Sequence, residues 1–219
     1  MKGKKQPVFV YGASGHAKVV IDAIEQEGKY TIALVVDDNP KLEGQSVFGY
    51  SKICGREDML DRAKRAKVKS GIVAVGNNSA RERIASWLAA KGFGFITVVH
   101  PSATIGRGVT IGAGSVMMPG AIVNSDTKIG EHVIINTGAT VDHDCAVGAF
   151  SHIAPGAHLC GTVTVGRRGF VCAGATVVPN RTIGNDVVIG AGSTVIQDVP
   201  GNVTAVGSPA QIMEKRKSS

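Results

Sequence analysis

The second half of the chain places an aliphatic residue at every sixth position without an insertion. The series begins at Ile105 and ends at Val195. The next residue is often Gly, and the fifth position of each hexad is usually small or β-branched. This pattern is typical of a parallel β-helix, in which three hexads form one triangular coil and the aliphatic side chains stack into a narrow core. An aromatic content of 5% and 29 glycines suit a core of small side chains and tight corners.

The first half of the chain follows a different pattern, in which short apolar runs alternate with amphipathic segments. The expected strands are Val8–Tyr11, Ile32–Val36 and Gly71–Val75, and the expected helices are Ala17–Glu27, Glu57–Lys67 and Ser79–Lys91. This alternation predicts βαβ units on a parallel sheet. We therefore expect a Rossmann-like α/β domain over residues 1–99 and an all-β parallel β-helix domain, with a C-terminal tail, over residues 100–219.

Charge, cysteine usage and hydropathy limit the partners and the cellular compartment that we expect. The net charge is +7, but the basic residues are scattered and cluster only at Lys2–Lys5, Arg62–Lys69 and Lys215–Lys217, so we do not expect a nucleic-acid partner. The four cysteines form no C-x-x-C pair, which suits a reducing compartment without disulfides. No apolar stretch is long enough to span a membrane and no signal peptide is evident. We expect a cytoplasmic protein without a membrane partner.

Polar residues interrupt the aliphatic repeat within a single coil. They are Asn136, Asp142, His143, Asp144 and His152. At eighteen residues per coil, His143 lies next to Gly161, whose missing side chain leaves room for a ligand beside the imidazole. A neutral imidazole accepts a proton near neutral pH, and an adjacent carboxylate, either Asp142 or Asp144, can orient it. The pattern predicts a general base at His143. The repeat also resembles that of the hexapeptide acyltransferases, and this resemblance implies acyl transfer by direct attack, with backbone N–H groups such as that of Gly161 stabilising the oxyanion.

The spacing of two histidines predicts an assembly. His143 and His152 are nine residues apart, which is half a coil, so they lie on different faces of one triangular prism. They can meet only between neighbouring prisms. This favours a homotrimer with three equivalent active sites between subunits.

Other candidate groups are weaker. Cys145 is two residues from His143 but occupies a small, inward position, which favours a buried structural thiol over a nucleophile. His132 and His158 are expected to be exposed corner residues, and His100 is expected at the junction between the domains. A zinc-dependent carbonic anhydrase of the γ class also has a β-helix, but the histidine spacing here does not match it, so no metal site is expected.

Polar and glycine residues follow the three expected strands of the first half. They are the loop Gly12-Ala13-Ser14-Gly15-His16, the pair Asp37-Asp38 and the turn Gly76-Asn77-Asn78. Because the carboxyl ends of parallel strands converge on one crevice, these segments predict a nucleotide site. NAD is disfavoured, since about a hundred residues form only half of the usual dinucleotide fold.

With these motifs the chain resembles the sugar-nucleotide acetyltransferases that N-acetylate UDP-linked 4-amino-4,6-dideoxy sugars in bacillosamine synthesis. GDP-perosamine N-acetyltransferases and sialic acid O-acetyltransferases are similar. The segments that carry the resemblance also include Ala74 to Asn78, His100-Pro101-Ser102-Ala103, Asn136 to His152 and Val206-Gly207-Ser208-Pro209-Ala210.

The resemblance implies a left-handed β-helix, acetyl-CoA as cosubstrate and no metal. It implies that His143 is the base and that Asp144, where the family often has Glu, raises its basicity. The nucleotide sugar, with UDP favoured and GDP-perosamine as the other possibility, would bind at Gly12, Ser14, Gly15, His16, Asp37, Asp38, Gly76 and Asn77. Acetyl-CoA would lie along Asn136, His152, Gly161, Ala173 and Ala191.

Two alternatives stay open at this point. The residues of the β-helix do not distinguish an amine acceptor from a hydroxyl, so O-acetylation of a sialic acid or a related sugar is the main alternative. A noncatalytic, ligand-binding β-helix protein is the other. The tail also departs from the family, because Gln211 follows the Pro-Ala pair where a basic residue is usual; Lys215, Arg216 and Lys217 are candidate replacements as a phosphate contact.

Overall fold

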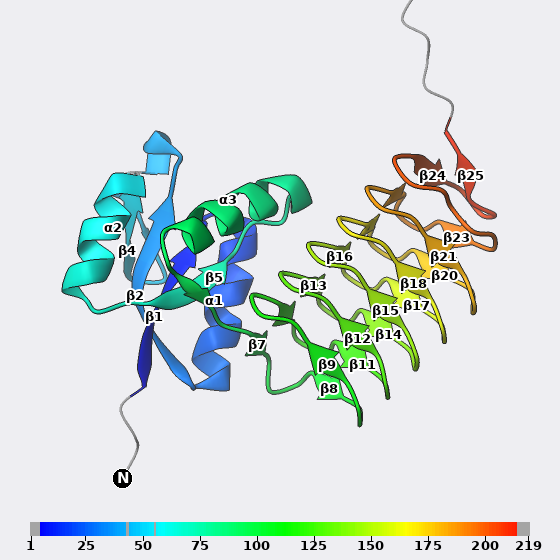
Figure 1. Ribbon diagram of the computed structural model, residues 1–219, viewed down its shortest axis with the longest axis horizontal. Coiled ribbons are helices and arrows are strands. Elements are labelled where there is room, and N and C mark those ends of the chain that lie inside the picture. Colours follow the sequence, from blue (N-terminus) through cyan, green and yellow to red (C-terminus); the bar gives the residue numbers. More distant parts are fainter. Residues whose placement is uncertain (1–4, 43, 55, 214–219) are drawn as a thin grey trace, which may run out of the picture.

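The computed structural model of the protein describes residues 5–42, 44–54 and 56–213. An α/β region lies at one end of the molecule, and a stack of triangular coils extends away from it (Figure 1). The fold class predicted from the sequence, an α/β region followed by a parallel β-helix, is confirmed.

The α/β region contains a parallel sheet with one antiparallel hairpin at its edge. Its elements are β1 (Gln6–Tyr11), α1 (Gly15–Glu27), β2 (Tyr30–Asp37), a 3₁₀ turn (Pro40–Leu42), β3 (Ser46–Val47), β4 (Tyr50–Cys54), α2 (Arg56–Arg65), β5 (Ser70–Val73), α3 (Asn78–Ala90) and β6 (Gly94–Phe95). The sheet order is β3-β4-β2-β1-β5-β6. The three predicted strands and three predicted helices are present. Strands β3 and β6 were not predicted because they have two residues each, and β4 was not predicted because its sequence, YSKIC, contains no apolar run.

Helices cover both faces of this sheet, which explains why the buried positions of its central strands are apolar. Val8 and Val10 of β1 pack in one hydrophobic cluster with α1, whereas Phe9 and Tyr11 belong to a second cluster with α2 and α3. Successive side chains of a strand point to opposite faces, so a strand buried on both faces has no polar positions.

The β-helix has three flat faces made of two-residue strands. The first face contains β7 (Val98–Val99), β10 (Val116–Met117), β13 (Ile134–Ile135), β16 (His152–Ile153), β19 (Phe170–Val171) and β22 (Val188–Ile189), and ends with β24 (Thr204–Val206) and β25 (Gln211–Ile212). The second face contains β8 (Thr104–Ile105), β11 (Ile122–Val123), β14 (Thr140–Val141), β17 (His158–Leu159), β20 (Thr176–Val177) and β23 (Thr194–Val195). The third face contains β9 (Thr110–Ile111), β12 (Lys128–Ile129), β15 (Ala146–Val147), β18 (Thr164–Val165) and β21 (Thr182–Ile183).

Each strand from β7 to β20 pairs in parallel with the strand eighteen residues later. The second residue of each strand, from Ile105 to Val195, is the aliphatic of the hexad and points into the core. We call the corner between the first and second faces the first edge, that between the second and third faces the second edge, and that between the third and first faces the third edge.

Helix α1 lies between the sheet and the first face of the β-helix. Val98, Val116 and Ile134 share one hydrophobic cluster with the buried side of α1. His100 lies at this junction as expected, because its Nε2 is 2.9 Å from Gln26 Oε1 of α1 and its Nδ1 is 2.7 Å from Ser102 Oγ. The β-helix begins with β7, which precedes residue 100, the predicted start of the second domain.

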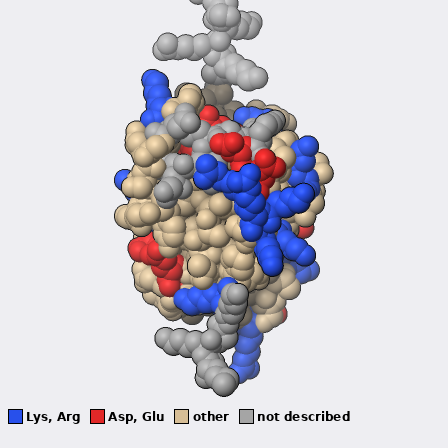
Figure 2. All heavy atoms as spheres, turned by 90° about the vertical axis from the view of Figure 1, so that its left-hand side faces the viewer, with Lys and Arg blue, Asp and Glu red and all other residues tan. Residues whose placement is uncertain are grey.

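Lys and Arg side chains gather on the face of the α/β region that carries α2 (Figure 2). Arg62, Lys64, Arg65, Lys67 and Lys69 are exposed there. The basic clusters at the two ends of the chain lie mostly outside the described residues, and so do Lys215, Arg216 and Lys217. In the described part of the chain, no helix combines the length and the hydropathy that a membrane crossing requires.

Candidate active site

The second edge of the β-helix carries a histidine and a carboxylate in direct contact. His143 Nδ1 is 2.8 Å from Asp144 Oδ2, and the two side chains are 57% and 59% exposed. Asp142 has a different task, because its Oδ1 accepts hydrogen bonds from the His143 backbone N–H and from Asn124 Nδ2, each at 2.8 Å. The sequence left open which aspartate pairs with the imidazole. In the structure it is Asp144.

The local charges favour protonation of His143. The pKa of His143 is raised above its ordinary value, first by the hydrogen bond to Asp144 and then by the negative charge of Asp142. The pKa of Asp142 is lowered, chiefly by the hydrogen bond from Asn124. Since a carboxylate only accepts, Nδ1 of His143 is the donor, and Nε2 of the neutral ring carries the lone pair that can take a proton.

Gly161 lies directly against this ring. A Cβ atom placed on Gly161 would be 2.7 Å from both Cε1 and Nε2 of His143. The eighteen-residue count that placed the two residues together is therefore correct. Any side chain at this position would displace the imidazole.

A second group of predicted residues surrounds His152 on the first face. His152 Nε2 is 2.9 Å from Asn136 Nδ2 at the first edge. Its ring stacks on Phe170 with centroids 5.0 Å apart, and the His16 ring from the start of α1 is 6.2 Å away. Burial, reinforced by the positive charge of Arg81, lowers the pKa of His152 to about 3 and that of His16 to about 4. Both rings are therefore neutral at pH 7.

The loop after β1 is held tightly at the end of the sheet. Gly12 has φ 119°, and a Cβ there would be 2.6 Å from the Ala74 carbonyl oxygen, so only glycine fits. Asp37 Oδ2 accepts from the Ala13 backbone N–H at 2.7 Å, and Asp38 Oδ1 accepts from Tyr11 Oη at 2.6 Å. Both carboxylates thus bind groups of β1 and of the loop that follows it.

The remaining residues of the expected nucleotide site lie at the same end of the sheet. Ser14 is the N-cap of α1 without a side-chain capping bond, and Gly15 is the first residue of that helix. Asn77 caps α3, with its Oδ1 accepting from the Ala80 N–H at 2.9 Å. The Gly76 backbone faces the His152 ring, where as an acceptor it offsets a small part of the lowering of that histidine's pKa.

The predicted residues form two groups that a single chain keeps apart. Ala173 and Ala191 lie at the first edge, where the Gly192 N–H donates to the Ala173 carbonyl at 2.9 Å, and Asn136 lies further down the same edge. His143, Asp144 and Gly161 lie at the second edge. Each group is assembled within one chain, but the two groups occupy different corners of the prism.

One histidine expectation is wrong. His132 is buried, and its ring stacks on Phe150 with centroids 4.8 Å apart and meets the edge of Phe95 at 4.4 Å. It was expected to be exposed because the repeat places it at a corner, and the structure does place it at a corner, with φ 54°. The α/β region covers this corner, and a cavity of about 470 Å³ lies beside the ring.

The other two secondary candidates are resolved by their surroundings. His158 is exposed as expected, but it lies in β17 rather than at a corner, with its Nδ1 2.9 Å from Thr140 Oγ1. Cys145 is the predicted buried thiol. Its Sγ donates to the Cys160 carbonyl at 3.2 Å and accepts from the Val163 N–H at 3.4 Å, and burial raises the pKa of the thiol. Among the described residues, no three His, Cys, Asp or Glu side chains are grouped so that they could hold a metal ion.

Comparison with known proteins gives consistent relatives. The family model described as the PglD N-terminal domain matches residues 7–88. A UDP-N-acetylbacillosamine N-acetyltransferase of Bacillus subtilis (strain 168) is 38% identical over 113 residues, which cover 51% of this chain and 50% of that protein. The match thus spans about half the length of this curated relative.

Two solved structures match almost the whole chain. PerB from Caulobacter crescentus, in complex with CoA and GDP-perosamine, is 39% identical with a TM-score of 0.89, covering 95% of this chain and 97% of PerB. The acetyltransferase domain of PglB from Neisseria gonorrhoeae FA1090 is 37% identical with a TM-score of 0.87, covering 95% of this chain and 100% of that domain. This chain belongs to the family of sugar N-acetyltransferases.

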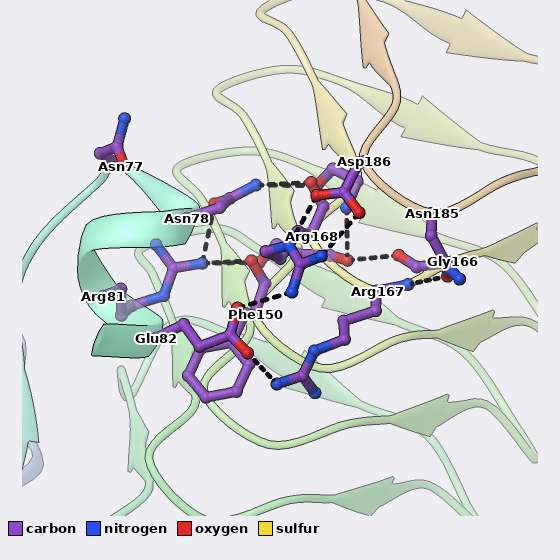
Figure 3. A network of polar contacts seen from close by, with 12 residues as sticks. Asn77, Asn78, Arg81, Glu82, Phe150, Gly166, Arg167, Arg168, Asn185 and Asp186 are labelled. Carbon is purple, nitrogen blue, oxygen red and sulfur yellow. Dashed lines mark hydrogen bonds and ion pairs between the residues drawn. The ribbon is translucent and has the colours of Figure 1, made fainter. Parts of the chain in front are cut away.

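For this acetyltransferase chain, the sequence did not reveal how α3 is attached to the β-helix (Figure 3). Arg81, in the first turn of α3, is 1% exposed. Its neighbour Glu82 binds Arg167 and Arg168 at the third edge, and Arg168 also binds Asp186 one coil further on. No local pattern marks these contacts, because the β-helix partners of Arg81 and Glu82 are 51 to 86 positions away in the sequence. A polar residue on the expected inner side of a helix is the one signal that could have indicated Arg81.

Proposed function

We propose that this protein is an acetyl-CoA-dependent N-acetyltransferase that acts on the 4-amino group of a nucleotide-linked 4-amino-4,6-dideoxy sugar. The observation that carries the proposal is the exposed His143–Asp144 pair with Nε2 of the imidazole against Gly161. Two relatives with nearly complete matches support it, since PerB was crystallised with CoA and GDP-perosamine and the PglB domain with acetyl coenzyme A. PerB variants in which one histidine is replaced by Asn or Ala were also crystallised with these ligands.

The chemistry needs one base and one thioester. The amine nitrogen attacks the thioester carbonyl, a C–N bond forms, and His143 Nε2 takes a proton from the nitrogen. Asp144 stabilises the imidazolium through Nδ1. The tetrahedral intermediate then collapses, the C–S bond breaks, and the sulfur leaves as the CoA thiol with the proton returned by His143. The Gly161 N–H is the nearest backbone donor for the oxyanion.

The nucleotide sugar binds at the ends of β1, β2 and β5. Gly12, Ser14, Gly15 and His16 supply the loop and the start of α1, and Asp37 and Asp38 hold that loop in place. Gly76 and Asn77 complete the crevice next to His152. A UDP-linked sugar is the expectation from the sequence, and GDP-perosamine is the natural comparator because the PerB match covers 97% of that chain.

The active site is completed by a second copy of the chain. His143 lies at the second edge, whereas Asn136, Ala173 and Ala191 lie at the first edge and His152 lies beside it. A homotrimer brings the second edge of one subunit to the first edge of the next, and acetyl-CoA lies in the cleft between them. Light scattering should give the mass of a trimer. Mixing inactive His143→Ala and His152→Ala subunits should restore part of the activity, and a monomeric, active protein would contradict this arrangement.

The direct test is release of the CoA thiol from acetyl-CoA with a panel of acceptors. The panel contains UDP- and GDP-linked 4-amino-4,6-dideoxy sugars and free sialic acid, and each is tested with the wild type, His143→Ala and the control Lys69→Ala. We expect turnover with one amino sugar, a loss of about 10³-fold in His143→Ala and no change in the control. Equal turnover in His143→Ala removes that residue as the base, and turnover with sialic acid alone favours O-acetylation.

A further inference from the structure

Arg81 is the largest side chain that the described part of the structure buries completely, and it has no carboxylate among its hydrogen-bond partners. A buried charge is costly unless every donor finds an acceptor. The guanidinium meets this requirement with the carbonyl oxygens of Val75, Gly76, His132, Phe150 and Ser151 and with Asn78 Oδ1.

These acceptors belong to two different parts of the molecule. Nη1 donates to the carbonyls of Val75 and Gly76, at 2.9 and 3.1 Å, in the loop between β5 and α3. Nε donates to His132 at 2.9 Å, and Nη2 donates to Phe150 and Ser151 at 2.7 and 3.2 Å. The last three carbonyls lie on two consecutive coils at the third edge. One planar group therefore joins the loop of the α/β region to the β-helix.

Both ends of this connection lie next to residues of the candidate site. Gly76 precedes Asn77, and Ser151 precedes His152 in the sequence. The Gly76 backbone also faces the His152 ring. The position of Arg81 thus fixes how far the end of β5 lies from the start of β16.

We propose that Arg81 is a positioning residue for acyl transfer, which holds the Gly76–Asn77 loop against His152 so that the sugar nucleotide is presented to the acetyl donor. This inference rests on the proposed function. Arginine suits the task because its five N–H donors are arranged in a rigid plane. Lysine carries the same charge on a single ammonium group and cannot satisfy both the loop and the two coils.

Substitutions of Arg81 can separate the effect of its hydrogen-bond geometry on His152 from the effect of its positive charge. The charged and titratable groups that act on His152 are Arg81 of α3 and His16 of α1, while its contacts Asn136 and Phe170 are neutral. An Arg81→Lys variant keeps the positive charge near both histidines but loses the planar set of donors. An Arg81→Gln variant loses both.

Glu82 provides a matched control on the same helix turn (Figure 3). It also connects α3 to the β-helix, through Arg167 and Arg168, but these contacts are partly exposed and none of them reaches the β5–α3 loop. A Glu82→Gln variant therefore weakens the same interface without changing the hydrogen bonds of Gly76.

The kinetic test measures KM for each substrate separately. We expect Arg81→Lys to raise KM for the nucleotide sugar about tenfold, because buried loop carbonyls lose their donors, and to change KM for acetyl-CoA less than about twofold. Glu82→Gln should leave both values within about twofold. Equal changes in both KM values for Arg81→Lys, or none, would overturn the proposal.

A measurement without substrates distinguishes this inference from the proposed function. Hydrogen exchange at the amides of residues 74–78 should become faster in Arg81→Lys and stay unchanged in Glu82→Gln. If the wild type acetylates no acceptor while this local change appears, the proposed function fails and the positioning of the loop stands. Uniformly faster exchange along the chain means that Arg81 only stabilises the fold.

A milder variant covers the case in which Arg81→Lys does not fold. Asn78→Ala removes one acceptor of Nη2 and leaves all five carbonyl contacts of Arg81. It also removes the hydrogen bonds that Asn78 Nδ2 donates to the Arg168 and Gly169 carbonyls. It should shift KM for the nucleotide sugar and loop exchange in the same direction but by less, about twofold to threefold. No shift in either measurement would contradict the proposal.

Discussion

His143 and His152 are nine residues apart on the same coil, yet their environments are opposite. His143 at the second edge is exposed and paired with a carboxylate, so its pKa is raised. His152 on the first face is buried beside another histidine and near a buried arginine, and its pKa is lowered to about 3. By this comparison His143 is the one suited to exchanging a proton near neutral pH, whereas His152 is suited to donating or accepting a fixed hydrogen bond.

The strongest test of this difference is Gly161→Ala. The new methyl group would lie 2.7 Å from the His143 ring, so the imidazole must move. Moving a catalytic group by about 1 Å costs about 10²-fold in kcat/KM. Assays of thiol release should show this loss. Gly94→Ala is the control, because a Cβ there meets nothing closer than 3.7 Å and activity should not change. Full activity in Gly161→Ala would mean that the ring does not act where the structure places it.

Replacing the partner of His143 should have a smaller effect on rate and a distinct effect on pH dependence. Asp144→Asn removes the main cause that raises the His143 pKa, so that pKa falls. In the proposed mechanism the neutral imidazole is the active form, so kcat/KM should increase as pH rises through this pKa, and the acid limb of the profile should move to lower pH in the variant.

The plateau of that profile should also fall by about tenfold, because the imidazolium loses a charge-assisted hydrogen bond. Asp142→Asn keeps an oxygen that can accept from the His143 N–H and serves as the comparison; its effect on the limb should be weaker, because Asp142 is only the second cause of the shift. An unchanged limb in Asp144→Asn would show that the pair does not set the basicity.

Cys145→Ala tests whether the second edge contains a nucleophile besides the base. Direct attack on the thioester predicts that kcat stays within about twofold of the wild type. The free energy of unfolding should fall by about 1 kcal/mol, because the Cys160 carbonyl loses the thiol donor and the Val163 N–H loses an acceptor. Denaturant titration measures the second quantity. A loss of turnover comparable to that of His143→Ala would indicate an acyl-enzyme on Cys145.

The last test changes no residue. Side-chain NMR of the histidines should show the pKa of His143 above its ordinary value of 6.5, while His16 and His152 stay neutral between pH 6 and 8. Resonances are assigned with the single His→Ala variants. Titration of His152 near pH 6.5 would remove the contrast between the two sites.

The sequence predicts the β-helix far better than it predicts the contacts of the α/β region with it. Each hexad carries its own information, so the register from Ile105 to Val195 and the meeting of His143 with Gly161 follow from counting. Burial of His132 does not, because Phe95 and Phe150 cover it from other elements. The burial of Arg81 could not be predicted for the same reason, since three of its acceptors are backbone carbonyls of distant coils. Which of Asp142 and Asp144 pairs with His143 depends on the directions of their side chains at the corner. The sequence does not reveal these directions, because an aspartate lies on each side of the histidine.

The regular register of the β-helix also spaces equivalent residues evenly along each edge. Neighbouring parallel strands are about 4.8 Å apart. Ala191 lies 55 positions after Asn136, which is three coils and one residue, so the two residues are separated by about 14 Å along the first edge. Adding or removing one coil beyond Gly161 would lengthen or shorten this edge by a single step and leave the residues around His143 untouched. The length of the proposed acetyl-CoA cleft and the chemistry at His143 can therefore change independently.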